Sequence, residues 1–216
     1  MKSNPQQSVA LTDEMLVERI LAGEQRLYEQ LIRRYNQRLY RLGMSVLGNE
    51  SAVEEAMQVT YINAWKHLSG FEQRSSLATW LSRIMLNQCF AEQRNAKRSS
   101  QLDTDQFKIV TMETPENALA NKELGAILER AIARLPEKYR LVFVLREIEK
   151  APVRETSEVL QIGEQNVKTR LNRAKALLKE DLTLMAADYI YGFHLLKCDR
   201  VVSAVMDQIV LNEQMP

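Results

Sequence analysis

The sequence has few cysteines, glycines and prolines: two, seven and five, respectively, in 216 residues. Cys89 and Cys198 lie far apart along the chain, so they form neither a disulfide framework nor a metal-ligand cluster. Reduced thiols in a cytoplasm are the simplest interpretation. Because helix breakers are scarce and Leu, Glu, Arg, Gln and Ala are abundant, the composition predicts an all-α protein.

Long apolar runs are also missing. No run approaches the roughly 18 residues that a membrane-spanning helix needs. The amino-terminal sequence MKSNPQQSVALTDE lacks the apolar centre of a signal peptide. We therefore expect a cytoplasmic protein with no membrane insertion of its own. A hydrophobic fraction of 45% is enough for a folded core.

The chain has no large excess of charge of either sign, since 29 basic and 28 acidic residues leave a net charge of +1. Any affinity for nucleic acid must therefore come from local segregation of charge. The pattern predicts two small helical domains, at 11–98 and 114–182. A linker without clear periodicity joins them at 99–113, and a helical C-terminal extension follows at 183–216. His194 and Cys198 alone make a poor metal site, so we expect no metal and no cofactor.

Three helices are predicted before residue 68. Thr12 is the expected N-cap of the first, and Gly48 is expected to end the second, at 25–47. The third, at 51–67, carries exposed acids and an apolar side, and the residues expected to face the core are Val53, Ala56, Met57, Ile62 and Ala64.

The segment 68–98 has the clearest pattern. Gly70 and several serines predict a loop at 69–76. Apolar residues then recur at three- and four-residue steps, which predicts a helix: Leu77, Trp80, Leu81, Ile84 and Met85. The opposite face carries basic and amide side chains: Arg83, Asn87, Gln88 and Arg94. Such a loop and helix suit single-stranded nucleic acid, and the alternative is an ordinary amphipathic helix with a solvated polar face.

A helix-turn-helix is predicted further on, with helices at 154–160 and 164–179 around a turn at 161–163. From Glu164 to Lys179 there are five basic residues and one acid. Phosphate contacts supply much of the affinity for duplex DNA, and a helix in the major groove contacts base edges. The candidate DNA-binding residues are Lys168, Thr169, Arg170, Asn172, Arg173 and Lys175. A basic amphipathic helix on a bundle is the alternative.

Both segments resemble those of extracytoplasmic-function sigma factors. GFEQRSSLATWLSRIMLNQCFAEQR is similar to their promoter-melting segment, and LPEKYRLVFVLREIEKAPVRETSEVLQIGEQNVKTRLNRAKALLKEDL to their carboxy-terminal domain. Gln73 and Gln161 stand where the family has glycine. The residues that carry the first match are Phe71, Ser75 or Ser76, Thr79, Trp80, Leu81, Ile84, Asn87 and Arg94.

The resemblance implies an alternative sigma factor without catalytic chemistry, which binds core RNA polymerase and promoter DNA and is held by an anti-sigma factor. The helix-turn-helix would bind the minus-35 element. The third helix would dock on the polymerase through Glu54, Glu55, Gln58, Tyr61 and Trp65. The residues expected at the minus-10 element are Ser69, Gly70, Phe71, Arg74, Ser75, Ser76, Trp80, Arg83, Asn87 and Arg94.

Two alternatives remain open at this level. One is a helix-turn-helix regulator that binds duplex DNA by itself, as a dimer, without polymerase. The other is a helical adaptor for protein interactions that has no role on DNA.

Overall fold

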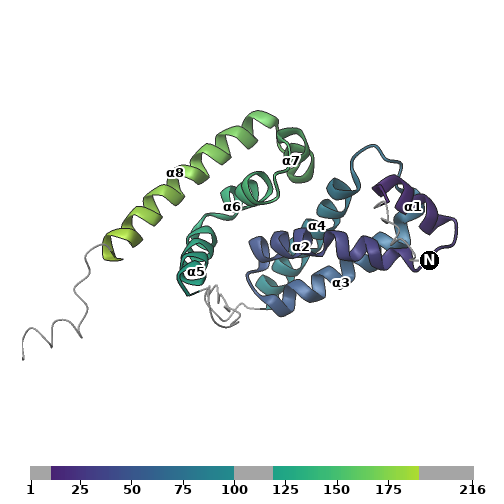
Figure 1. Cartoon of the computed structure of the whole chain (residues 1–216), viewed down its shortest axis with the longest axis horizontal. Coiled ribbons are helices and arrows are strands. Elements are labelled where there is room, and N and C mark those ends of the chain that lie inside the picture. Colours follow the sequence, from purple (N-terminus) through teal and green to yellow (C-terminus); the bar gives the residue numbers. More distant parts are fainter. Residues whose placement is uncertain (1–10, 100–118, 190–216) are drawn as a thin grey trace, which may run out of the picture. The chain divides into compact units, whose positions relative to one another are not determined.

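The computed structural model describes residues 11–99 and 119–189, and within these ranges all regular structure is helical (Figure 1). The all-α prediction is confirmed. The predicted linker beyond Ser99, the helix start predicted at Thr114, and the extension beyond Tyr189, including His194 and Cys198, lie outside the described residues. No described helix is both long enough and apolar enough to cross a membrane.

The amino-terminal group contains α1 (Asp13–Leu21), α2 (Leu27–Leu47), α3 (Glu50–His67), the 3-10 turn η1 (Leu68–Gly70) and α4 (Leu77–Ser99). The Thr12 hydroxyl accepts a hydrogen bond from the Met15 amide at 3.3 Å, so the predicted N-cap is confirmed. Gly48 ends α2 as predicted, with a left-handed φ of 63°. The Asn49 side chain caps α3 by accepting from the Ala52 amide at 2.9 Å.

The core of this group lies where α2 packs against α3 and α4. Leu39 and Leu81 are fully buried there, and each such side chain contributes about 1.5–3 kcal/mol. Gly43 permits the close approach of the helices. A Cβ at this position would lie 2.6 Å from Met85 Cε and 2.7 Å from Val53 Cγ1. A small residue is therefore required at this point of α2.

The carboxy-terminal group contains α5 (Leu119–Arg134), α6 (Glu137–Phe143), the π-helical turn η2 (Val144–Ile148), α7 (Val153–Leu160) and α8 (Glu164–Tyr189). The predicted helix at 154–160 is confirmed to within one residue. The second predicted helix continues beyond 179 as α8, because the sequence up to Tyr189 contains neither glycine nor proline. The π-helical turn was not predicted.

Polar contacts join the two groups within the unit of the chain that ends at Leu178. Arg140 is only 5% exposed and donates from Nε to the Ser45 carbonyl at 2.7 Å and from Nη1 to the Leu135 carbonyl at 3.0 Å. These carbonyls offset the cost of burying the guanidinium. Two ion pairs add to this contact: Arg38–Glu155 and Arg41–Glu149.

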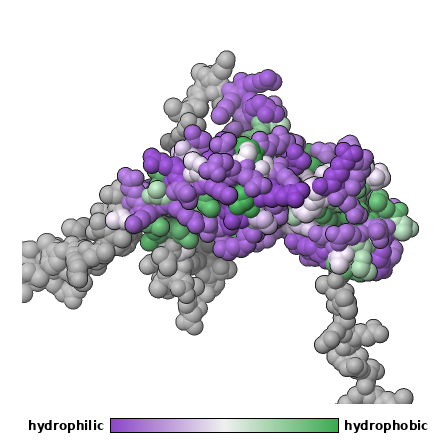
Figure 2. Space-filling view, turned by 90° about the horizontal axis from the view of Figure 1, so that it is seen from above, coloured by the Kyte–Doolittle hydropathy of each residue, from purple (hydrophilic) through white to green (hydrophobic). Residues whose placement is uncertain are grey.

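The surface is mostly hydrophilic on the face seen in Figure 2, and hydrophobic side chains form smaller, separate patches there. Five large hydrophobic residues within the described ranges are exposed: Met15, Leu21, Ile62, Trp65 and Leu128. Two of these, Ile62 and Trp65, lie on α3, the helix that sequence analysis predicted as a docking surface.

Candidate nucleic-acid interface

The loop at 69–76 is tied to the helix that follows it. The Ser76 hydroxyl accepts from the Thr79 amide at 3.1 Å and lies 2.9 Å from the Thr79 hydroxyl, so Ser76 caps α4. The rings of Phe71 and Trp80 pack with centroids 5.1 Å apart and planes tilted by 39°. Both rings are half-buried. These two predicted DNA contacts therefore also hold the loop against α4.

Gln73 occupies the position where the resembled family has glycine, and its φ is 55°. This is the left-handed region, which glycine enters freely and a residue with a side chain enters at a cost. The loop thus keeps the glycine-type turn while carrying an exposed amide side chain.

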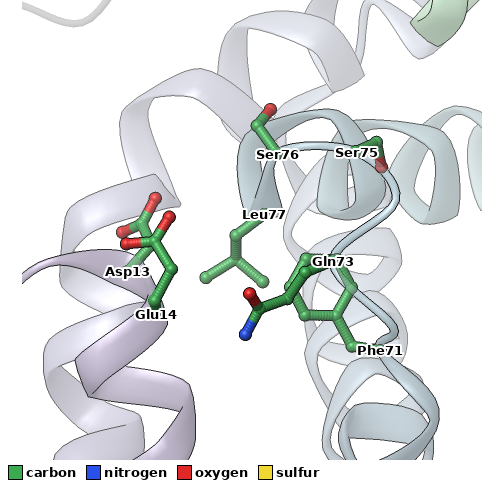
Figure 3. Close-up of a pocket in the computed structure, with 7 residues that line it drawn as sticks. All are labelled: Asp13, Glu14, Phe71, Gln73, Ser75, Ser76 and Leu77. Atoms are coloured by element: carbon green, nitrogen blue, oxygen red, sulfur yellow. The ribbon is translucent and has the colours of Figure 1, made fainter.

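A hollow of about 190 Å³ lies between this loop and the first turn of α1 (Figure 3). Asp13 and Glu14 stand on one side and Gln73 on the other, and Leu77 points in between them. The two acids were not predicted, because only the tertiary fold brings α1 against the loop, and Gln73 was noted only as a departure from the family pattern. The residues that line the hollow are Asp13, Glu14, Phe71, Gln73, Ser75, Ser76 and Leu77.

The polar face of α4 presents the other predicted single-strand contacts. Asn87 and Arg94 are exposed and Arg83 is half-buried. In the loop, Arg74 is exposed and forms an ion pair with Glu72. The remaining predicted loop contacts vary in exposure: Ser69, Gly70 and Ser76 are exposed and Ser75 is half-buried.

On α3 the structure corrects two predictions. Ile62, predicted to face the core, is 54% exposed, whereas Tyr61, predicted to dock, is 7% exposed. The Tyr61 hydroxyl donates to the Ile32 carbonyl at 3.2 Å, and its own carbonyl accepts from Tyr28 at 2.6 Å. Packing against α2 therefore turns Tyr61 inward and Ile62 outward. Burial raises the pKa of Tyr28 to about 12.

The exposed side of α3 forms a stripe of four residues at three- and four-residue steps: Glu54, Gln58, Ile62 and Trp65. Trp65 is 40% exposed and meets Tyr28 edge-on, with ring centroids 4.9 Å apart. Glu55 is exposed beside the stripe. The predicted docking surface thus combines acidic, amide and apolar side chains.

The helix-turn-helix is closed by a tight turn between α7 and α8. Gln161 ends α7 with a left-handed φ of 53°, and the Ser157 hydroxyl donates to the Ile162 carbonyl at 2.5 Å. Val167 on α8 is fully buried, which fixes the opposite face of α8 outward. Lys168, Thr169, Asn172 and Arg173 are exposed, and Arg170 is half-buried.

Lys175 is exposed as well, but its ammonium lies 2.7 Å from Glu147 Oε1 in η2. This hydrogen bond lowers the pKa of Glu147. Lys175 was predicted as a DNA-binding residue, and its partner within the protein was not foreseen.

Comparison with known proteins gives matches in both groups of helices. The family model described as "Sigma-70 region 2" matches residues 31–99, and the one described as "Sigma-70, region 4" matches residues 125–178. Together they cover more than half of the chain. The first match contains the loop and α4, and the second contains the helix-turn-helix.

Individual relatives are similar over most of their length. The ECF RNA polymerase sigma factor SigW of Bacillus subtilis is 29% identical over 176 residues, which are 77% of this chain and 94% of SigW. The ECF RNA polymerase sigma-E factor of Escherichia coli K12 is 30% identical over 178 residues, 78% of this chain and 93% of the relative. A solved structure of CnrH in complex with the cytosolic domain of CnrY superposes with a TM-score of 0.59 at 27% identity, covering 82% of this chain and 98% of that one.

Proposed function

The chain belongs to the extracytoplasmic-function sigma factors of the sigma-70 family, which are not enzymes and direct RNA polymerase to promoters, and we propose how its surfaces divide this task. It binds core polymerase and promoter DNA. The observation that carries the proposal is that one chain has two different surfaces. One is the capped loop beside the hollow, and the other is the exposed basic face of α8. Single strands and duplex DNA need these two different surfaces.

The exposed face of α8 contacts the minus-35 element. Lys168, Thr169 and Asn172 reach base edges in the major groove, and Arg170 and Arg173 contact phosphates. Lys175 interacts both with a DNA phosphate and with Glu147.

The loop at 69–76 receives a base that flips out of the minus-10 element, while Asn87 and Arg94 on α4 contact the non-template strand. Extruding a base costs a few kcal/mol, which stacking and phosphate contacts offset. Melting of the promoter follows from this preference for the extruded base.

The stripe on α3 docks on the polymerase. Ile62 and Trp65 supply the apolar centre, and Glu54, Glu55 and Gln58 supply the polar rim of an interface. Trp65→Ala therefore lowers the affinity for core polymerase by about 1–2 kcal/mol or more.

The regulatory partner is an anti-sigma factor. CnrH, a structural relative at 27% identity, is solved in complex with the cytosolic domain of CnrY, which supports a protein partner here. The place of action is the cytoplasm, where polymerase and promoter DNA meet.

Reconstituted transcription tests the proposal. The purified chain is combined with core polymerase on a promoter library, and RNA start sites are sequenced. Asn172→Ala is expected to relax the base preference at one minus-35 position. Arg173→Ala is expected to weaken binding to all promoters alike and to lower the slope of log affinity against log salt concentration by about one. Tight operator binding without polymerase favours a stand-alone regulator. An adaptor predicts no transcription and no effect of Arg173→Ala.

A further inference from the structure

The hollow beside the loop has both apolar and polar walls, which different residues provide. Phe71 and Leu77 provide apolar surface, which suits the face of a ring. Glu14 and Gln73 stand on opposite sides of the opening (Figure 3). A volume of about 190 Å³ is below the range of pockets for drug-sized ligands, so it suits one base rather than a nucleotide pair.

The two acids from α1 have different roles. Asp13 is already engaged, because its Oδ1 lies 2.5 Å from Arg34 Nη1 and its Oδ2 accepts from the Tyr35 hydroxyl. Glu14 is exposed and has no hydrogen-bond or ion-pair partner among the described residues. Its carboxylate is therefore available to whatever enters the hollow, and it disfavours a phosphate there.

We propose that Glu14 and Gln73 determine which base enters, by selecting one that presents an exocyclic amine, cytosine among the pyrimidines, over thymine. This proposal rests on the function proposed above. A carboxylate only accepts hydrogen bonds, so it pairs with the amine of cytosine and repels the carbonyl that thymine carries at the same ring position. The Gln73 amide both donates and accepts, and so it completes the contact with the edge of the base.

The backbone of Gln73 supports the assignment. A glutamine held at φ 55° is disfavoured relative to glycine, and such outliers often belong to sites that use them. At this position the side chain stands at the hollow, opposite Glu14.

The test uses the holoenzyme on promoter templates in which each minus-10 base is varied in turn. The wild-type protein is expected to prefer cytosine over thymine about tenfold at one position. Glu14→Gln is expected to lower this ratio below about threefold, because an amide also donates to the thymine carbonyl. Gln73→Gly is expected to lower it as well. Glu18→Gln, an exposed acid on the same helix that does not line the hollow, is the matched control and keeps the wild-type ratio.

The outcomes separate the two proposals. An unchanged ratio in Glu14→Gln and Gln73→Gly, with transcription retained, overturns the assignment of these residues and leaves the sigma-factor function intact. An equal loss of activity on all templates in both variants, with helical content retained by circular dichroism, shows a structural role and overturns it too. No transcription by the wild-type protein on any template contradicts the function itself.

Discussion

The ammonium of Lys175 on α8 lies 2.7 Å from the Glu147 carboxylate in η2, so one cation on the exposed basic face of α8 has a partner inside the protein. The Lys175 side chain is 52% exposed and that of Glu147 is 32% exposed. An ion pair this exposed contributes little to stability. Its main consequence is electrostatic, because the carboxylate neutralises part of the charge that α8 offers to DNA.

Removing that carboxylate is expected to strengthen DNA binding. Glu147→Gln frees Lys175 for phosphate, so affinity for minus-35 duplex rises and the slope of log affinity against log salt steepens by up to about one. Fluorescence anisotropy at several salt concentrations measures this. Glu29→Gln is the control, since Glu29 forms an ion pair with Arg33 within α2, at higher exposure than the Lys175–Glu147 pair, and should leave the slope unchanged. Weaker binding by Glu147→Gln would show that the pair positions α8.

A methyl group at Gly43 is expected to disrupt the core between α2, α3 and α4. Gly43→Ala places a Cβ within 2.7 Å of atoms of Met85 and Val53, and overpacking of this kind costs about 1–3 kcal/mol. Gly125→Ala is the matched control, because a Cβ at Gly125 of α5 meets nothing within 4 Å. It should stabilise the helix by about 0.5–1 kcal/mol. Urea unfolding measures both, and equal midpoints would refute the assigned close contact.

Local signals in the sequence predicted the elements well. Thr12 and Gly48 mark helix ends through interactions within a few residues, and the apolar period of α4 is independent of the rest of the chain. The helix-turn-helix could be predicted from the sequence for the same reason. The π-helical turn after α6 has no such local signal.

Side-chain partners between distant elements were not predictable. On α3 both Tyr61 and Ile62 are apolar enough for a core, and the contacts of Tyr61 with α2 decide which one is buried. Glu14 gives no hint in the sequence that it faces Gln73 across a hollow. The Lys175 partner likewise depends on how α8 packs on η2.

Replacing Gln161 with glycine is expected to stabilise the protein. At a φ of 53°, a residue with a Cβ is conformationally strained in the folded state. This strain exceeds the extra chain entropy that glycine loses on folding, so Gln161→Gly should stabilise the protein by about 0.5–1 kcal/mol. The side chain is exposed, so its removal loses no packing. Gln37→Gly, in the interior of α2, should instead destabilise by about 1 kcal/mol. The urea midpoints of the two variants must move in opposite directions, and a lower midpoint for Gln161→Gly contradicts the argument.

Cys89 is expected to be chemically inert while the protein is folded. The side chain is fully buried, and burial raises the pKa of the thiol to about 12. At pH 8 the reactive thiolate is then a fraction of roughly 10⁻⁴, so labelling must pass through an opened state with an ordinary thiol pKa. In a Cys198→Ser background, a thiol reagent should modify Cys89 slowly in buffer and completely in urea. Fast labelling of the folded protein at pH 8 would refute the burial. A slow reaction means that Cys89 does not sense oxidants directly and serves the packing of α4.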